Sequence, residues 1–414
     1  MYVKRQTIMN GKTILILGGG VGGIVTANAL RERLASEHRI IIVDKRAKYI
    51  FSPSLLWVMA GLRQPEQITK DLRHMLQSGI EIVQAEVQDI DPERAIVRTN
   101  GDDLAYDHLV VTLGADLAPE VMPGYIETAH NFFDLAGATK LWSALQRFEG
   151  GRVAVLVSAM PFKCPAAPYE AAMLIEDVLR RRGIRDRCQV QVFTPEPQPM
   201  LVAGPDMGVS VVGMMAAKNI GFHPNLPLDY IDSTGKTLVF KNGRQESFDF
   251  LAAVPPHRPP SVVKESSLAN EAGWVTVDKH TLQTRFENVY AIGDVTAIIL
   301  SNGLPLPKAG TFAHAEAEAV AERIAAEIGG GVPQAEFDGV GYCWIEAGSG
   351  SAGFASGQFY AEPNPVIGQP RSGRFWHWGK VMFETYWMDK GFRRYLARSG
   401  LNLGSRVFGI SSSL

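Results

Sequence analysis

Cys164 is the residue most suggestive of chemistry, because it lies where a glycine would be expected. It belongs to FKCPAAPYE (162–170), at the predicted turn of a βαβ unit that in a nicotinamide-binding domain carries a glycine-rich loop. A pyrophosphate can approach such a turn only where the backbone lacks Cβ atoms. We therefore expect this unit to have lost nicotinamide binding.

A separate βαβ unit near the N-terminus has the spacing of a dinucleotide-binding loop. An apolar run (13–17) precedes the G-x-G-x-x-G pattern, a helical stretch reaches residue 34, and a second apolar run (39–44) ends in an acid that can bind a ribose hydroxyl. A later strand and turn, LVVTLGA (109–115), should lead the chain out of this domain. The expected cofactor contacts here are Gly18, Gly20, Gly23, Asp44, Lys45 and Gly114.

Two segments further along indicate that the dinucleotide is FAD. NVYAIGDV (288–295) places Gly293 and Asp294 after a β-rich stretch and, we expect, at a helix start, where the acid can accept a ribitol hydroxyl of FAD. The alternative is an Asp N-cap, which is compatible with that role. Lys308 and Gly310 precede an alanine- and glutamate-rich helix, where a cation and helix N-terminal amides would stabilise a reduced flavin ring.

Composition excludes several classes of protein. The chain is 46% apolar and 20% charged, long enough for two or three domains, and its net charge of -2 gives no reason to expect nucleic acid. Three cysteines are too few for a disulfide framework, and we expect no metal site. We also expect no export signal in the first residues and no transmembrane helix, since no run of about 18 apolar residues occurs.

These motifs predict an α/β fold with two Rossmann-like dinucleotide-binding domains. The FAD-binding domain should comprise 1–118 and 261–330, and the second domain 119–260, with Cys164 in its altered loop. Residues 331–414 should carry a redox cysteine, a quinone site and a membrane-binding segment.

The chain resembles the family of sulfide:quinone oxidoreductases and flavocytochrome c sulfide dehydrogenases over nearly its whole length. The resemblance rests on the N-terminal glycine loop, FSPSLLWVMAG (51–61), KCPAAPYE, VPPHRPPSVVKESSL (254–268), AIGDV, LPKAGTFAHAEAEAV (306–320) and the segment around Cys343. It implies that Cys164 and Cys343 form a redox pair beside FAD, and that sulfide is oxidised and a membrane quinone reduced. The third functional cysteine of many members is missing. Because no cysteine lies between Met1 and Phe162, we expect FAD to be bound non-covalently.

Other side chains in these segments have both a functional and a structural interpretation. Glu170 is either the base that takes protons from sulfide or a first-turn carboxylate favoured by the helix dipole. The two cysteines could instead be buried small apolar residues. Cys188 is predicted to be structural, and His130 to be a packing or surface group.

The C-terminal segment predicts membrane contact. Residues 371–398 contain seven Lys or Arg, two acids and three Trp. Phe375, Trp378, Met382 and Tyr386 should share one face of an interfacial helix, with Phe383 and Trp387 beside them, while Lys380, Lys390, Arg393 and Arg394 reach lipid headgroups. A packing or dimer helix is the alternative, and a homo-oligomer stays open. The expected quinone contacts are Phe354, Phe359, Phe375 and Lys308.

We thus expect a peripheral protein of a prokaryotic cytoplasmic membrane that oxidises sulfide and reduces quinone. Two alternative enzymes differ from this one in electron donor or acceptor, and a third alternative is not an enzyme. A flavocytochrome c flavin subunit would pass electrons to a haem partner, and a type II NADH dehydrogenase would need the second glycine loop. A flavin-bound module without activity would not retain both cysteines and Lys308.

Overall fold

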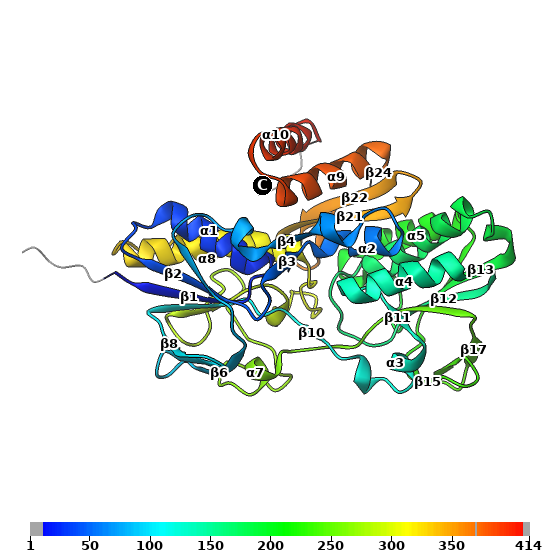
Figure 1. Cartoon of the computed structure of the whole chain (residues 1–414), viewed down its shortest axis with the longest axis horizontal. Coiled ribbons are helices and arrows are strands. Elements are labelled where there is room, and N and C mark those ends of the chain that lie inside the picture. The colour runs from blue at the N-terminus through cyan, green and yellow to red at the C-terminus, as the bar shows by residue number, and fades with distance from the viewer. Residues whose placement is uncertain (1–10, 369–370, 409–414) are drawn as a thin grey trace, which may run out of the picture.

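Two five-stranded parallel sheets form the cores of two lobes that lie side by side (Figure 1). The computed structural model describes residues 11–368 and 371–408, so the expectation for the N-terminal ten residues lies outside it. The first sheet has the order β20-β9-β1-β2-β5. Its strands are β1 (Thr13–Leu17), β2 (Arg39–Val43), β5 (Ile80–Val83), β9 (His108–Val111) and β20 (Val289–Ala291).

The second sheet repeats this arrangement in the middle of the chain, with the order β11-β18-β12-β13-β14. Its strands are β11 (His130–Asn131), β12 (Gly151–Val157), β13 (Cys188–Phe193), β14 (Ile220–His223) and β18 (Phe250–Val254). The central strands are buried apolar runs, because helices cover one face of each parallel sheet and short antiparallel strands cover most of the other (Figure 1).

Short antiparallel pieces complete the lobes and join them. They are β3 (Lys48–Ile50), β4 (Thr69–Asp71), β6 (Val87–Asp91), β7 (Ile96–Thr99), β8 (Asp103–Ala105), β15 (Leu228–Asp232), β16 (Thr237–Phe240) and β17 (Gln245–Ser247). The chain passes between the lobes in two segments, and these pair through the antiparallel strands β10 (Asp116–Leu117) and β19 (His257–Arg258).

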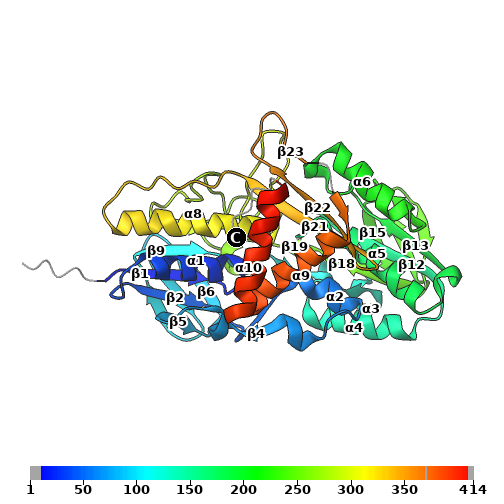
Figure 2. The same cartoon turned by 90° about the horizontal axis from the view of Figure 1, so that it is seen from above.

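Helices cover the sheets in each lobe. In the first lobe α1 (Val21–Arg33) lies alongside α8 (Gly310–Ile328), as Figure 2 shows. In the second lobe α5 (Ala167–Arg181) follows the altered loop and packs on β12 and β13. The other helices before the C-terminal region are α2 (Leu55–Met59), α3 (Tyr125–Thr128), α4 (Leu135–Arg147), α6 (Pro205–Ala216) and α7 (Ser261–Lys264).

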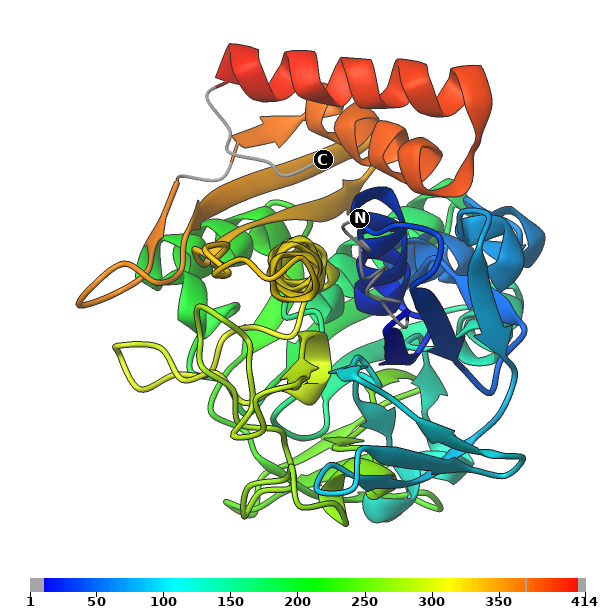
Figure 3. The ribbon, with the colours of Figure 1, turned by 90° about the vertical axis from the view of Figure 1, so that its left-hand side faces the viewer.

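The C-terminal region covers the junction of the lobes. Strands β21 (Val340–Gly348) and β22 (Ser351–Gln358) form a hairpin, to which β23 (Val366–Ile367) and β24 (Arg371–Gly373) add. Helix α9 (Arg374–Met388) packs on β22, and α10 (Gly391–Phe408) lies outermost across α9 (Figure 3). The single interfacial helix expected from the sequence is therefore two helices.

The predicted α/β fold with two dinucleotide-type sheets is confirmed. No helix in residues 11–368 or 371–408 is long and apolar enough to cross a membrane. One local expectation is wrong: Gly293 and Asp294 do not start an α-helix. They lie in a three-residue 3-10 turn (Gly293–Val295), and α8 begins only at Gly310, because Pro305 and Pro307 interrupt the intervening chain.

Candidate active site

The first glycine loop has the open backbone that a dinucleotide phosphate needs. A Cβ at Gly23 would lie 1.9 Å from the carbonyl oxygen of Gly18, so this glycine is required for the loop to pack on its helix. A Cβ at Gly20 would meet nothing within 4 Å. Packing within the protein therefore does not require glycine at position 20, and the space above it is free for a phosphate at the N-terminus of α1. The residues present fit the expected FAD.

Asp44 lies at the carboxyl end of β2, beside this loop. Its carboxylate accepts a hydrogen bond from Gly19 N at 2.7 Å and pairs with Arg46. Burial raises the pKa of Asp44, but the hydrogen bonds and charge of Arg46 outweigh it and leave that pKa below its usual value. Lys45 points elsewhere and pairs with Glu86. Asp44 therefore lies where a ribose hydroxyl would be bound, and the cofactor roles of Asp44 and Lys45 both stay predictions.

Three of the expected cofactor contacts, Gly293, Asp294 and Lys308, lie near the N-terminus of α8. Lys308 Nζ donates to the carbonyl oxygens of Asp294 and Thr296 and lies 3.8 Å from the ring centroid of Trp274. Burial lowers the pKa of Lys308 to about 8. Gly293 N donates to the buried carboxylate of Glu316, a residue that the sequence analysis missed.

The two glycines that flank this region differ in backbone. Gly114, after β9, has a φ of +71°, whereas Gly310 is the first residue of α8. Contact between either residue and a cofactor stays a prediction.

Cys164 and Cys343 face each other although they lie far apart in the sequence. Cys164 precedes α5 with a left-handed φ of +58°, and its N–H donates to the carbonyl of Lys308. Cys343 lies in β21 against α5. Burial raises the pKa of the Cys164 thiol to about 12, and burial together with the nearby Cys164 raises the pKa of Cys343. Both are free thiols that need a base to become thiolates.

Glu170 is the carboxylate beside these thiols. It is 2% exposed, and its Oε2 accepts hydrogen bonds from Glu346 N and from Lys380 Nζ, each at 2.9 Å. Burial raises the pKa of Glu170, opposed by the charge of Lys380. The charges of Glu170 and Lys380 act on both thiols in opposite directions. The structure therefore brings together the three residues expected to be catalytic and adds a buried ammonium.

The second βαβ unit is closed to a nicotinamide nucleotide. Glu196 follows β13, where the ribose-binding acid of a dinucleotide fold is found. Its carboxylate accepts hydrogen bonds from Tyr169 Oη at 2.5 Å and from Thr194 Oγ1 at 3.0 Å, all within the protein. The first turn of α5 is buried beneath β21. His130, which the sequence analysis expected to be a packing or surface group, stacks on Phe250.

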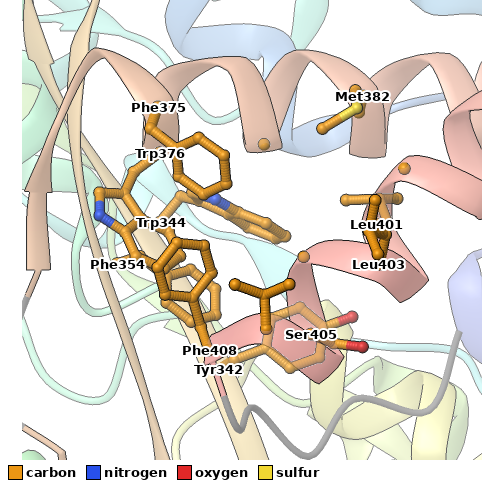
Figure 4. Close-up of a pocket in the computed structure, with 14 residues that line it drawn as sticks. Tyr342, Trp344, Phe354, Phe375, Trp376, Met382, Leu401, Leu403, Ser405 and Phe408 are labelled. Atoms are coloured by element: carbon orange, nitrogen blue, oxygen red, sulfur yellow. The ribbon is translucent and has the colours of Figure 1, made fainter.

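An apolar pocket lies on the other side of β21. Side chains alternate along a strand, so Tyr342 and Trp344 point into the pocket, opposite Cys343 (Figure 4). The cavity is about 290 Å³, with α9 and α10 forming the rest of its wall. Two of the expected quinone contacts, Phe354 and Phe375, line it.

The other two expected quinone contacts lie elsewhere. Phe359 is buried against Phe312, and Lys308 lies beside a separate small cavity. The four residues predicted to bind quinone are therefore not brought to one place, because Phe359 packs beneath the hairpin rather than under α9.

Several expectations for the C-terminal segment are wrong in detail. Lys380 does not reach lipid headgroups, because it is 5% exposed and paired with Glu170. Phe383, Tyr386 and Trp387 are also buried, where Phe383 and Trp387 pack on Phe51. The exposed apolar side chains of this region are Phe375 and Trp378 on α9, and Phe392, Tyr395, Leu396, Leu403 and Val407 on α10.

The sequence analysis missed the polar face of α9. His377 Nδ1 lies 3.0 Å from Glu346, Lys380 pairs with Glu170, and Glu384 pairs with Arg63 at 2.7 Å. A signal was present, since three polar residues at i, i+3 and i+7 in an otherwise aromatic helix form one face. A polar face on a helix rich in Trp and Phe indicates that the helix packs against charged groups inside the protein.

The comparisons with known proteins agree with this geometry. A family model described as pyridine nucleotide-disulphide oxidoreductase matches residues 12–319. The mitochondrial sulfide:quinone oxidoreductase of Mus musculus is 25% identical, covering 96% of this chain and 92% of its own length. That of Dictyostelium discoideum is 30% identical, covering 71% and 67%. The crystal structure of the Aquifex aeolicus sulfide:quinone oxidoreductase superposes with a TM-score of 0.82 at 25% identity, covering 97% and 95%.

Proposed function

The chain belongs to the pyridine nucleotide-disulphide oxidoreductase family, within its sulfide:quinone oxidoreductase branch, and on this premise we propose that it oxidises sulfide at Cys164 and Cys343 and reduces a membrane quinone. It is an oxidoreductase. One observation carries the proposal: the two thiols lie on one side of β21 and the apolar pocket on the other.

The thiol site has the parts that sulfide oxidation needs. Bound FAD would supply the two-electron oxidant that joins the two free thiols as a disulfide, with loss of two protons. Sulfide is a soft nucleophile that attacks such a disulfide and leaves a persulfide on one cysteine. The thiol set free by this attack leaves as a thiolate, which Lys380 stabilises by its charge. Glu170 takes a proton from the incoming hydrogen sulfide, since it is a buried carboxylate adjoining both sulfurs.

The first lobe provides the binding site for FAD, which supplies a two-electron acceptor between sulfur and quinone when bound. The loop at Gly18–Gly23 would hold the pyrophosphate, and Asp44 would accept a hydrogen bond from a ribose hydroxyl. Lys308 places a positive charge near the flavin ring, held by two carbonyl oxygens.

The pocket between β21, α9 and α10 is the proposed quinone site. Its volume of about 290 Å³ is at the lower end of the range of about 300–1,000 Å³ for small-molecule sites, and aromatic side chains dominate its wall. The indole Nε1 of Trp344 is buried without a hydrogen-bond partner in the part of the chain that the structure describes. A quinone carbonyl oxygen supplies the acceptor that this N–H lacks.

The outer surface of α10 supports peripheral membrane contact. Phe392 and Leu396 are 73% and 52% exposed, and the same helix carries Arg393, Arg394 and Arg398. Exposed apolar side chains with neighbouring basic groups are typical of helices that lie in a membrane interface. The pocket beneath α10 then lies close to the lipid, from which a quinone enters.

NADH is disfavoured as the electron donor. The acid that would bind its ribose is engaged by Tyr169, and the α5 N-terminus that would bind its pyrophosphate is covered by β21. A type II NADH dehydrogenase activity would need both to be free.

The proposal is tested by anaerobic stopped-flow spectroscopy of the FAD-loaded protein. Micromolar sulfide should bleach the flavin, NADH should not, and decylubiquinone should restore the oxidised spectrum. Bleaching by NADH but not by sulfide would overturn the proposal. Membrane contact is tested by sedimentation with anionic liposomes. The double variant Phe392→Ser/Leu396→Ser should lose binding, whereas Val209→Ser, equally exposed on α6, should retain it.

A further inference from the structure

Four ionisable side chains from three elements form a line that begins at the thiols. Glu170 on α5 accepts a hydrogen bond from Lys380 on α9 at 2.9 Å. Glu346 on β21 lies beside this pair, since its backbone N–H donates to the same Glu170 oxygen at 2.9 Å, and the charge of its carboxylate raises the pKa of Lys380. Glu346 in turn lies 3.0 Å from Nδ1 of His377, one helical turn before Lys380 on α9.

The exposed fraction of these side chains differs between the two ends of the line. The side chains of Glu170, Lys380 and Glu346 are 3%, 7% and 1% exposed, whereas that of His377 is 23% exposed. The three inner groups are therefore shut off from solvent, and the line ends at a group that solvent reaches. Glu346 and His377 have no part in the sulfur chemistry described above.

The surroundings of the outer end are also defined. The ring of Trp57 packs edge-on against His377 and lies 5.1 Å from Lys380 Nζ. On the far face of this region Arg63 lies over Trp57 and pairs with Glu384. The charged groups that face His377 and its partners are thus Glu346, Lys380 and Glu170, together with the Arg63–Glu384 pair.

We propose that this line is the proton exit of the thiol site and that His377 is its outer, positioning end, an inference that rests on the proposed function. Oxidation of one molecule of hydrogen sulfide to the sulfane level releases two electrons and two protons at the sulfur. The electrons leave through the flavin to the quinone, whose reduction takes up two protons at the pocket. The protons of hydrogen sulfide pass to Glu170, whose side chain is 3% exposed, and need a separate route out from there.

Each transfer along the route moves one proton and changes no oxidation state. Glu170 passes a proton to Lys380 as the ammonium gives its own to Glu346. Glu346 passes one to Nδ1 of His377, and the imidazole releases the proton of its other nitrogen to water. After one passage the two carboxylates and the ammonium regain their starting protonation. His377 then carries its proton on Nδ1 instead of Nε2, and it regains its starting tautomer by proton exchange with water before the next passage.

The test is the rate of flavin bleaching by sulfide in FAD-loaded His377→Gln. The variant should be slower by about 10-fold, should show a larger solvent deuterium isotope effect, and should recover when imidazole is added to the buffer. Glu346→Gln should slow in the same way, without rescue by imidazole. His74→Gln, an exposed histidine in a different part of the first lobe, is the matched control and should behave as the parent does. If His377→Gln fails to bind FAD, His377→Asn replaces it, because the Asn amide nitrogen occupies the place of Nδ1.

The outcomes separate this inference from the proposed function. If the parent protein is not bleached by sulfide, the function itself is wrong. If the parent bleaches and His377→Gln matches it in rate and isotope effect, the proton route is wrong. Slowing without rescue, with an equal loss in reoxidation by decylubiquinone, would show that His377 only supports the fold and would also overturn the route.

Discussion

In the first βαβ unit the acid after the second strand, Asp44, accepts a hydrogen bond from the backbone of its own glycine loop. In the second unit the acid at the corresponding place, Glu196, accepts one from the phenol of Tyr169 in the crossover helix α5. Both units keep parallel strands and a crossover helix. The difference teaches that the scaffold persists without its loop, because burial of the strands and helix does not depend on the loop. Cofactor binding depends on the loop and on what covers the helix N-terminus.

The largest effect on flavin bleaching is expected when a glycine replaces Cys164, as in the glycine loop of the first unit. Cys164 already has a left-handed φ, so Cys164→Gly should fold without strain. Bleaching by sulfide should fall by about 1,000-fold or more, and NADH should still not bleach the flavin, since Tyr169 and β21 close the site. Stopped-flow spectra with each donor measure both. Cys188→Ser is the control, and NADH bleaching in Cys164→Gly would show that the loop alone had excluded nicotinamide.

The next largest effect is on FAD affinity and concerns the free space at Gly20 in the first glycine loop. Gly20→Val should leave the apoprotein as stable as the parent, because its Cβ meets no protein atom within 4 Å. FAD affinity should drop by about 100-fold, or about 2.8 kcal/mol. Fluorescence titration of apoprotein with FAD measures this. Gly213→Val, whose Cβ is equally unobstructed on α6, is the matched control. Unchanged affinity in Gly20→Val would place the phosphates elsewhere.

Glu170→Gln should slow bleaching by sulfide by about 30-fold. In the parent protein burial raises the pKa of Glu170, so its carboxylate forms only at higher pH than an ordinary one, and the rate should rise with pH through that range. The rising limb should disappear in the variant. Rates measured across pH test this, with the exposed Glu66→Gln as control. An identical profile would reduce Glu170 to a structural carboxylate.

The smallest effect is on stability. Tyr169→Phe removes a donor from the buried Glu196 and should cost about 1–2 kcal/mol of the free energy of unfolding. Burial already raises the pKa of Glu196 and the Tyr169 hydrogen bond lowers it, so the loss should grow as pH rises and the carboxyl must ionise. Urea unfolding in mildly acidic and mildly alkaline buffer measures this. The exposed Tyr230→Phe should be neutral, and a loss confined to acidic buffer would contradict the assignment.

The elements that the sequence predicted well are those specified locally. The apolar runs around the first glycine loop, the strand before Cys164 and the alanine-rich helix after Lys308 are all observed within a residue or two. Their signals are periodicity and turn residues, which act over short stretches. The motifs also singled out both cysteines and Glu170, whose catalytic roles stay predictions.

What could not be predicted depends on pairing between distant segments. Lys380 has the sequence context of a headgroup-binding residue, and only the approach of α9 to α5 makes it the partner of Glu170. Phe359 and Phe354 lie close together on or beside β22, yet the packing of the hairpin sends one beneath α8 and the other toward α9. No local pattern distinguishes them.

Because α10 supplies one wall of the pocket, the helix and any ligand in the pocket are thermodynamically linked. Leu401, Leu403 and Phe408 of α10 face Trp344 and Trp376 across the cavity, and α10 joins α9 through the short turn at Asp389 and Lys390. A ligand that touches both walls stabilises docked α10 by about 2.7 kcal/mol at 100 times its Kd. Occupancy of the pocket should therefore protect that turn from proteases, so limited proteolysis can report ligand affinity without any turnover.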